Sequence, residues 1–506
     1  MRMFSLFVLP GLIVGLLAGP NIGCSKQSPQ IQKSEQKLNE TEELASRGPS
    51  AQAGQILVTD LAGQPVAGAQ IMIGQRISEP FAGNIIVTDK SGHAPIPASW
   101  TTSLPVTVEA KGFVRTTFFA RTPEDTRHLK VRVRPVADSS IELKGETQGY
   151  GKIRNDGWLD LGLVLPTMSR GQLAAIHITD VFAREIDVLS VLGNQQRIPS
   201  NLAVPTQTKT YMIPLQFSKP LYRQYFPAPG AYRVQAIHAR VNIADMVGEL
   251  RRGASILELV NRFSFTEVGI KNVTVKKGTT ETPLPINETK LASTLDFVAP
   301  NFDANLDLFT MVMARSESDY FISDIKKLGP GERAKLTAPS GPGSRGLLMH
   351  LMRNRTKDPG DALRGASSAT MSLAISAPTV GMTPEFLEIV PAPVRASQTR
   401  LKLSPPRNFL GLLNSMTYVV LSKVEPIGAD NYKLEKTSPE WELYVNDWTT
   451  NVDLPEMPSG LPSMKAGQMR WEASFVGQPN ESDRPQAPGP EGFEKATHVT
   501  RSAVDF

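Results

Sequence analysis

The sequence predicts a mainly β protein, built from tandem antiparallel β-sandwich domains with one short helical insertion. Forty prolines and 39 glycines among 506 residues favour many turns over long helices. Short runs in which apolar and polar residues alternate recur along the chain, a pattern typical of half-buried strands. The best helical periodicity is confined to residues 242–262. A chain of this length accommodates two to four such domains.

The first 24 residues have the pattern of an export signal. Arg2 precedes an apolar run from Phe4 to Leu17, which is shorter than the ~20 residues that a membrane-spanning helix needs. Gly23 then precedes Cys24, the only cysteine. This stretch resembles the lipobox of bacterial lipoproteins, which implies cleavage before Cys24 and acylation of its thiol and new amino group. Ordinary secretion and an uncleaved anchor are the alternatives.

Lipidation of Cys24 would leave no free thiol, which excludes disulfides, cysteine-bound zinc and thiol catalysis. We therefore expect a cell-envelope protein held to the membrane by a lipid anchor, with Ser25 compatible with transfer to the outer membrane. Residues 25–53, rich in Ser, Gln, Lys, Glu and Asn, predict a flexible tether. A weak helix over residues 33–44 is the alternative.

Residues 54–135 predict a first β domain. A strand over 55–60, a turn over 61–65 and a strand over 66–73 suggest a hairpin. The region resembles the carboxypeptidase regulatory-like, transthyretin-like module, which implies a seven-stranded sandwich that serves as a spacer or docking module without chemistry. The residues that carry this resemblance are Gly54, Asp60, Gly63, Pro65, Val66, Gly68, Ala69, Thr88, Asp89, Gly92, Ala110, Gly112 and Phe113.

Residues 136–275 predict a second β-rich domain. Asp156 and Gly157 form a favoured two-residue hairpin turn, whereas residues 167–192 fit either a helix or a strand. Within 242–262 we expect two short helices, because Asn242 and Ser255 can cap them and Gly253 separates them. This insertion is either a lid packed on a sandwich edge or an element that binds a partner or the membrane surface.

Residues 276–290, rich in Pro and Thr, predict a linker, and residues 291–506 predict one or more C-terminal β-rich domains. Polar, Gly- and Pro-rich stretches at 329–345, 354–368 and 477–492 suggest exposed loops. A final alternating run at 496–506 predicts a strand that pairs into a sheet. The other expected strands are 291–298, 306–313, 347–353, 369–376, 418–424, 441–445 and 470–476.

No motif predicts a catalytic, cofactor or metal site. The P-loop, the G-x-S-x-G elbow and the H-E-x-x-H helix do not occur. Residues 341–346 spell G-x-G-x-x-G, but a Pro- and Ser-rich loop precedes them where a strand would be needed. The remaining candidates are weak pairs or isolated residues: Ser34 with Lys37, Ser323 with Lys326, His177 with Asp180, the carboxylates Asp296, Asp303 and Asp307, and His93, His128, His238, His350 and His498.

The 54 basic and 49 acidic side chains are dispersed without a Lys/Arg block, so the sequence has no electrostatic footprint for nucleic acid. We expect an exported, lipid-anchored envelope protein that acts as a non-catalytic binding, adhesion or structural module. Its partner would be an envelope protein or a polysaccharide. The alternative is an envelope hydrolase, or an enzyme accessory protein, with a site assembled in the C-terminal half.

Overall fold

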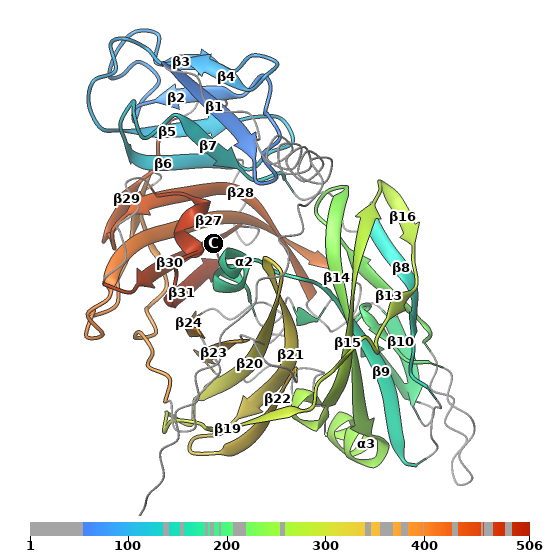
Figure 1. The fold of residues 1–506 in the computed structure, drawn as a ribbon. Coiled ribbons are helices and arrows are strands. Elements are labelled where there is room, and N and C mark those ends of the chain that lie inside the picture. The colour runs from blue at the N-terminus through green and yellow to red at the C-terminus, as the bar shows by residue number, and fades with distance from the viewer. Residues whose placement is uncertain are drawn as a thin grey trace, which may run out of the picture. The chain divides into compact units, whose positions relative to one another are not determined.

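β-Strands form most of the computed structural model, and the mainly β prediction is confirmed (Figure 1). Thirty-one strands, two α-helices and two 3-10 helices lie in the described residues. Among these residues, no helix is long and apolar enough to cross a membrane. The structure describes residues 54–134, 141–151, 156–177, 181–182, 187–191, 194–205, 219–252, 259–339, 346–354, 368–375, 383–397, 399–427, 434–456, 459, 469–480 and 488–505.

The first seven strands form two sheets, drawn in blue to teal in Figure 1. One sheet has the order β4-β1-β7, and the strands β3-β2-β5-β6 belong to the other. Ile56 and Val58 from the first sheet and Ile71 and Val108 from the second are buried in one core cluster. The strands are β1 Gln55–Asp60, β2 Gln70–Ile73, β3 Ile85–Val87, β4 His93–Pro95, β5 Leu104–Glu109, β6 Arg115–Arg121 and β7 His128–Val131.

The predicted hairpin over 55–73 is wrong, because β1 pairs with β4 and β7 whereas β2 pairs with β3 and β5. Only the start of a hairpin forms, where Val66 N–H donates to the Val58 carbonyl. The chain then crosses to the other sheet. Thr88 holds this crossing, since its hydroxyl donates to the Val66 carbonyl (2.7 Å) and accepts from Ala69 N–H (2.8 Å).

Residues 141–290 form a second pair of sheets. One sheet contains β8 (Ile141–Gln148), β13 (Leu221–Tyr225) and β16 (Gly278–Glu281). The other has the order β12-β9-β14-β15-β18. Leu143 and Tyr222 from the first sheet share a buried cluster with Val164 and Ala236 from the second. The strands of the second sheet are β12 Leu202–Ala203, β9 Trp158–Pro166, β14 Gly230–Asn242, β15 Ser264–Val275 and β18 Thr289–Lys290.

Two predictions concern the connections in this region. The first arm of the hairpin predicted at Asp156 and Gly157 lies over residues 152–155, outside the described residues, although Gly157 does adopt the positive φ that the turn requires (+83°). Residues 276–290 are not a linker: β16 and β17 (Leu284–Pro285) pair in parallel with β8, and β18 pairs with β15. The physical reason is that Leu284 and Ile286 are buried in the core between the sheets.

Both helices begin at side-chain caps. Helix α2 (Arg170–Ala175) settles the ambiguity at its position in favour of a helix, and Ser169 and Gln172 form its capping box. Helix α3 (Ile243–Arg251) begins where predicted, because Asn242 Oδ1 accepts from two backbone N–H groups. Met246 is buried in the core, so α3 packs as a lid. The second predicted helix lies mostly outside the described residues, and a 3-10 turn, η3 (Val260–Arg262), follows it.

Every strand predicted after residue 290 is observed, including the last, β31 (His498–Asp505), which lies between β24 and β30. The predicted loop 329–345 is wrong over β22 (Arg333–Ala338), which pairs with β19. Only Leu336 of β22 is fully buried, so its apolar signal is weak. The confirmed strands are β19 Ser293–Val298, β20 Leu306–Ser316, β23 Gly346–Asn354, β24 Ser368–Ile375, β27 Leu413–Ile427, β28 Leu434–Asn446 and β30 Met469–Gln478.

Further elements were not predicted, or lie where the sequence left helix and strand open, as β10 does. β21 (Asp319–Leu328) pairs with β20, and β10 (Asp187–Val191) and β11 (Asn194–Ile198) form a hairpin in the second region. A small sheet consists of β25 (Val394–Ser397), β26 (Arg400–Lys402) and β29 (Asn451–Asp453). The 3-10 helix η4 (Pro490–Phe493) overlaps the end of the predicted loop 477–492.

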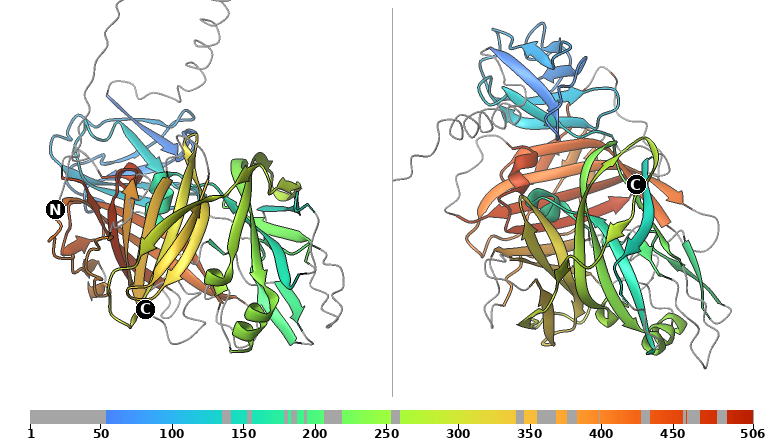
Figure 2. Two further views of the ribbon diagram at one scale, coloured as in Figure 1. Left: turned by 60° about the horizontal axis from the view of Figure 1, so that its bottom comes forward. Right: turned by 45° about the vertical axis from the view of Figure 1, so that its right-hand side comes forward.

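The largest sheet joins the first and last parts of the chain. Its order is β21-β20-β23-β24-β31-β30-β27-β28-β6-β5-β2-β3, so β6 of the first region pairs in parallel with β28 (Figure 2). Trp441 is fully buried at this junction and donates its indole N–H to the Thr117 hydroxyl (2.9 Å). The first region therefore shares a continuous sheet with the C-terminal half.

Candidate functional site

The structure disperses the residues that the sequence singled out. The Ser323 hydroxyl lies within hydrogen-bonding distance of two backbone carbonyls, and Lys326 Nζ donates to the Phe263 carbonyl (2.9 Å), so these two residues form no nucleophile–base pair. Asp307 pairs with Lys327 (3.2 Å), and Asp303 accepts from Asn305 N–H. Asp296 lies on β19, paired with Lys335 of β22 in the register. Cys24, Ser34, Lys37, Asp180 and residues 341–345 lie outside the described residues.

The six histidines are all structurally engaged. Within the described ranges, no group of three or more His, Cys, Asp or Glu side chains is arranged to hold a metal ion. His177 Nε2 lies 3.4 Å from a carboxylate oxygen of Glu472. The other five hydrogen-bond a hydroxyl: His93 with Ser91, His128 with Thr59, His238 with Thr266, His350 with Thr310 and His498 with Thr497.

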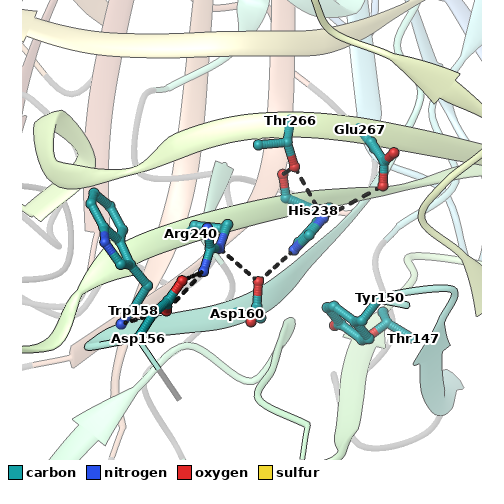
Figure 3. A network of polar contacts seen from close by, with 9 residues as sticks. All are labelled: Thr147, Tyr150, Asp156, Trp158, Asp160, His238, Arg240, Thr266 and Glu267. Carbon is teal, nitrogen blue, oxygen red and sulfur yellow. Dashed lines mark hydrogen bonds and ion pairs between the residues drawn. The ribbon is translucent and has the colours of Figure 1, made fainter. Parts of the chain in front are cut away.

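His238 contacts two carboxylates in addition to its hydroxyl partner. Its Nε2 lies 3.0 Å from Asp160 Oδ1, and its Nδ1 lies 3.0 Å from Thr266 Oγ1 and 3.7 Å from Glu267 Oε2 (Figure 3). These residues come from β9, β14 and β15, three neighbouring strands. We call Asp160, His238, Arg240, Thr266 and Glu267 the His238 network.

Strand alternation places this network on the face that looks into the sandwich. On β14, Ile237 and Ala239 pack in the large core on one side of the sheet, whereas Val234 and Ala236 pack in the core between the two sheets. His238 and Arg240 continue the second series, because residues two apart share a face. The inner face therefore changes from apolar to polar along the strand.

A β-bulge brings Thr266 to the imidazole. In the register, His238 is opposite Glu267 and Ala239 is opposite Phe265, which leaves Thr266 as the extra residue of β15. Bulges re-aim side chains in this way. The Thr266 hydroxyl consequently reaches the Nδ1 side of His238.

Arg240 fixes the other end of the network. Its Nε donates to Asp160 Oδ1 (3.0 Å), and its Nη2 donates to Asp156 Oδ2 (3.0 Å). The hydrogen bond from Arg240 lowers the pKa of Asp156 below its ordinary value. The guanidinium also lies 5.6 Å from the Trp158 ring centre, a favourable cation–π geometry.

Tyr150 covers the imidazole. Its ring is perpendicular to that of His238 with centroids 5.2 Å apart, and its hydroxyl bonds the Thr147 hydroxyl. Burial raises the pKa of Tyr150, so the phenol stays protonated at neutral pH. A Cβ at Gly162 would lie 2.7 Å from both hydroxyl oxygens, so this close approach requires glycine at 162.

Chemically, the network can act in two ways. Hydroxyl, imidazole and carboxylate follow one another at 3.0 Å, which is the order of groups in a nucleophile–base–carboxylate triad. The same contacts also satisfy both ring nitrogens of a side chain that is only 9% exposed, and satisfied buried networks rigidify a fold. Sequence reasoning missed this site because its residues meet only through strand pairing.

Comparison with other proteins adds no relative: no protein-family model matches the chain, and no curated protein matches it.

Proposed function

We propose that this chain is an exported, lipid-anchored envelope protein that acts as a non-catalytic binding, adhesion or structural module. The observation that carries the proposal is the twelve-stranded sheet, which joins residues 115–121 to residues 434–446. A continuous sheet is a rigid scaffold, and binding surfaces are disproportionately located on loops held by such scaffolds. An envelope protein or a polysaccharide is the expected partner.

Support for the location comes from the sequence. Arg2, the apolar run from Phe4 to Leu17 and the Gly23–Cys24 pair form the signal, and residues 25–53 have the composition of a tether. Several acyl chains on Cys24 would give stable attachment, because each buried methylene contributes about 0.8 kcal/mol. Ser25 suits outer-membrane transfer in bacteria that sort by this position.

The test compares the parent chain with Cys24→Ser and with Ser25→Thr as a matched control, all expressed in a bacterial host. Membranes are washed with high salt and the protein in each fraction is quantified. We expect the parent and Ser25→Thr in the membrane and Cys24→Ser in the soluble fraction. Equal membrane retention of Cys24→Ser would refute the anchor. Sedimentation of the parent with insoluble peptidoglycan or polysaccharide then tests the binding role.

The second candidate function is an envelope hydrolase, and the alignment of Thr266, His238 and Asp160 is the observation that favours it. The site lies in the middle of the chain and not in the C-terminal half that the sequence suggested. Hydrolysis of an activated ester by the parent, reduced to background in Thr266→Val and retained in the neighbouring Ser264→Ala, would favour this function over the first. Equal rates in both variants would eliminate it.

A further inference from the structure

A charged pocket of about 460 Å³ lies beside β8 and β13 and shares no lining residue with the His238 network. Its volume is within the range of small-molecule sites in proteins. In Figure 1, β10 lies beside β13 at this side of the sandwich, and it supplies one of the lining residues. The lining consists of Glu142, Lys144, Asp187, Lys219, Pro220, Leu221 and Arg223.

Two cations face each other across the strands of this pocket. Lys144 of β8 and Arg223 of β13 are direct partners in the antiparallel register. Both side chains lie on the outer face of the sheet, because Leu143 and Tyr222 beside them are fully buried in the core. Like charges directly opposite each other on antiparallel strands are destabilising. The pair therefore costs stability unless an anion compensates it.

The chain compensates this pair only in part. Lys144 Nζ lies 3.7 Å from Glu281 Oε1, and the Glu281 side chain is 74% exposed, so this ion pair is weak. Arg223 Nη2 donates to Asp187 Oδ1. Asp187 is shared, since its Oδ2 also lies 2.9 Å from Lys219 Nζ. One buried carboxylate thus serves two cations of the pocket.

Lys219 has no donor left for a ligand. Besides its ion pair with Asp187, its ammonium donates to the carbonyl of Ser200 (2.9 Å) and to that of Leu202. Burial lowers its pKa, which fits a side chain held inside the protein. Lys219 therefore positions Asp187, which in turn holds the guanidinium of Arg223.

The Glu142 carboxylate of the pocket also has a partner. Glu142 Oε2 accepts from the Thr279 hydroxyl (2.9 Å) and lies opposite Tyr225 in the register. The spare donors are on the basic side. Nε and Nη1 of Arg223 have no partner among the described residues, and Lys144 has only its long contact with Glu281. Pro220 and Leu221, which is 36% exposed, add apolar surface.

We infer that this pocket binds a small ligand through an oxyanion, either a carboxylate or a phosphate. The guanidinium of Arg223 and the ammonium of Lys144 bind the oxyanion, since guanidinium suits carboxylate and phosphate geometry and lysine adds a point charge. Leu221 and Pro220 contact the carbon skeleton. An acidic sugar and a phosphate ester both fit this chemistry, and the experiment distinguishes them.

The experiment is isothermal titration calorimetry on the purified full chain in detergent, at constant ionic strength, with glucuronate and inorganic phosphate as separate probes. We expect saturable binding of at least one probe at one site per chain. Binding of glucuronate alone assigns a carboxylate ligand, and binding of phosphate alone assigns a phosphate ligand. Binding of neither probe overturns the inference.

Three variants test the residues. Arg223→Gln and Lys144→Gln should each weaken binding at least tenfold, whereas Lys290→Gln, an exposed cation on β18 of the same sandwich, should bind like the parent. Equal affinity in all three variants overturns the inference. Thermal unfolding without ligand is a second measurement: Lys144→Gln should melt at or above the parent temperature, because it removes a like-charge pair. A lower melting temperature would contradict that account of the pocket.

Discussion

His350 makes a specific contribution to the pH dependence of stability. Its side chain on β23 is 2% exposed, stacks on Phe297 with centroids 4.9 Å apart, and hydrogen-bonds Thr310 Oγ1 through Nδ1 (3.0 Å). Burial lowers its pKa from 6.5 to about 4. The folded protein consequently holds this imidazole neutral in a range where the unfolded chain protonates it.

The sign and the size of this contribution to stability follow from the linkage between proton binding and folding. Because the pKa is lower in the folded state, the unfolded state binds the extra proton between pH 6.5 and about 4, and stability falls as the pH falls through this range. At 1.36 kcal/mol per pH unit, this lowering of the pKa corresponds to about 3 kcal/mol of stability. This contribution is fully present above pH 6.5 and is lost near pH 4.

The assay is urea unfolding at 25 °C from pH 7.5 to 4.5 for the parent, His350→Gln and Thr310→Val. His128 and His498 also have lowered pKa values through burial, and Asp324 has a raised one, but all three are common to the compared chains. Subtracting the His350→Gln profile from the parent profile therefore isolates His350. Thr310→Val should be less stable at every pH yet keep the parent slope. Identical slopes for the parent and His350→Gln would refute the reasoning.

Three further substitutions test the local structure by thermal or urea unfolding. Gly68→Ala should cost about 1–2 kcal/mol, because position 68 has φ +69° but open space around a Cβ. Gly92→Ala should cost about 1–3 kcal/mol more, since its Cβ would lie 2.6 Å from the Val58 carbonyl oxygen, and equal costs would contradict the geometry. Met246→Asp should destabilise by at least about 2 kcal/mol, because α3 buries this side chain; an unchanged melting temperature would mean that α3 is not a packed lid.

The elements that the sequence predicted correctly are those whose signal is local. The strands β31 and β20 each have an alternating or continuously apolar pattern over eight or more residues, and the Asn242 side chain caps α3. A short stretch of sequence is therefore enough to predict each of these elements. β22 was missed because its strand state depends on pairing with β19, with little apolar content of its own. The prediction of a linker at 276–290 was wrong because the burial of Leu284 and Ile286 outweighs the Pro- and Thr-rich composition of this segment.

The two candidate sites could not be predicted from local sequence patterns, because they too depend on strand pairing. Asp160 and His238 are 78 residues apart and meet because β9 and β14 pair, and Thr266 joins them through a bulge. Lys144 and Arg223 become a like-charge pair only in the register of β8 and β13. The sequence shows which residues are present, but it does not show the strand registers that bring these residues together.

The pairing of β6 with β28 brings together residues that are far apart in the sequence. Thr117 and Trp441 are 324 residues apart, yet their side chains hydrogen-bond inside the protein. Beside them, Glu442 is 2% exposed and accepts from the Tyr418 hydroxyl (2.9 Å), and Arg132 of the first region lies 2.8 Å from the same carboxylate oxygen. A buried carboxylate is tolerated only when it is paired and hydrogen-bonded. Because residues from both regions satisfy Glu442, separating them would leave a buried charge without its cation and β6 as an open sheet edge.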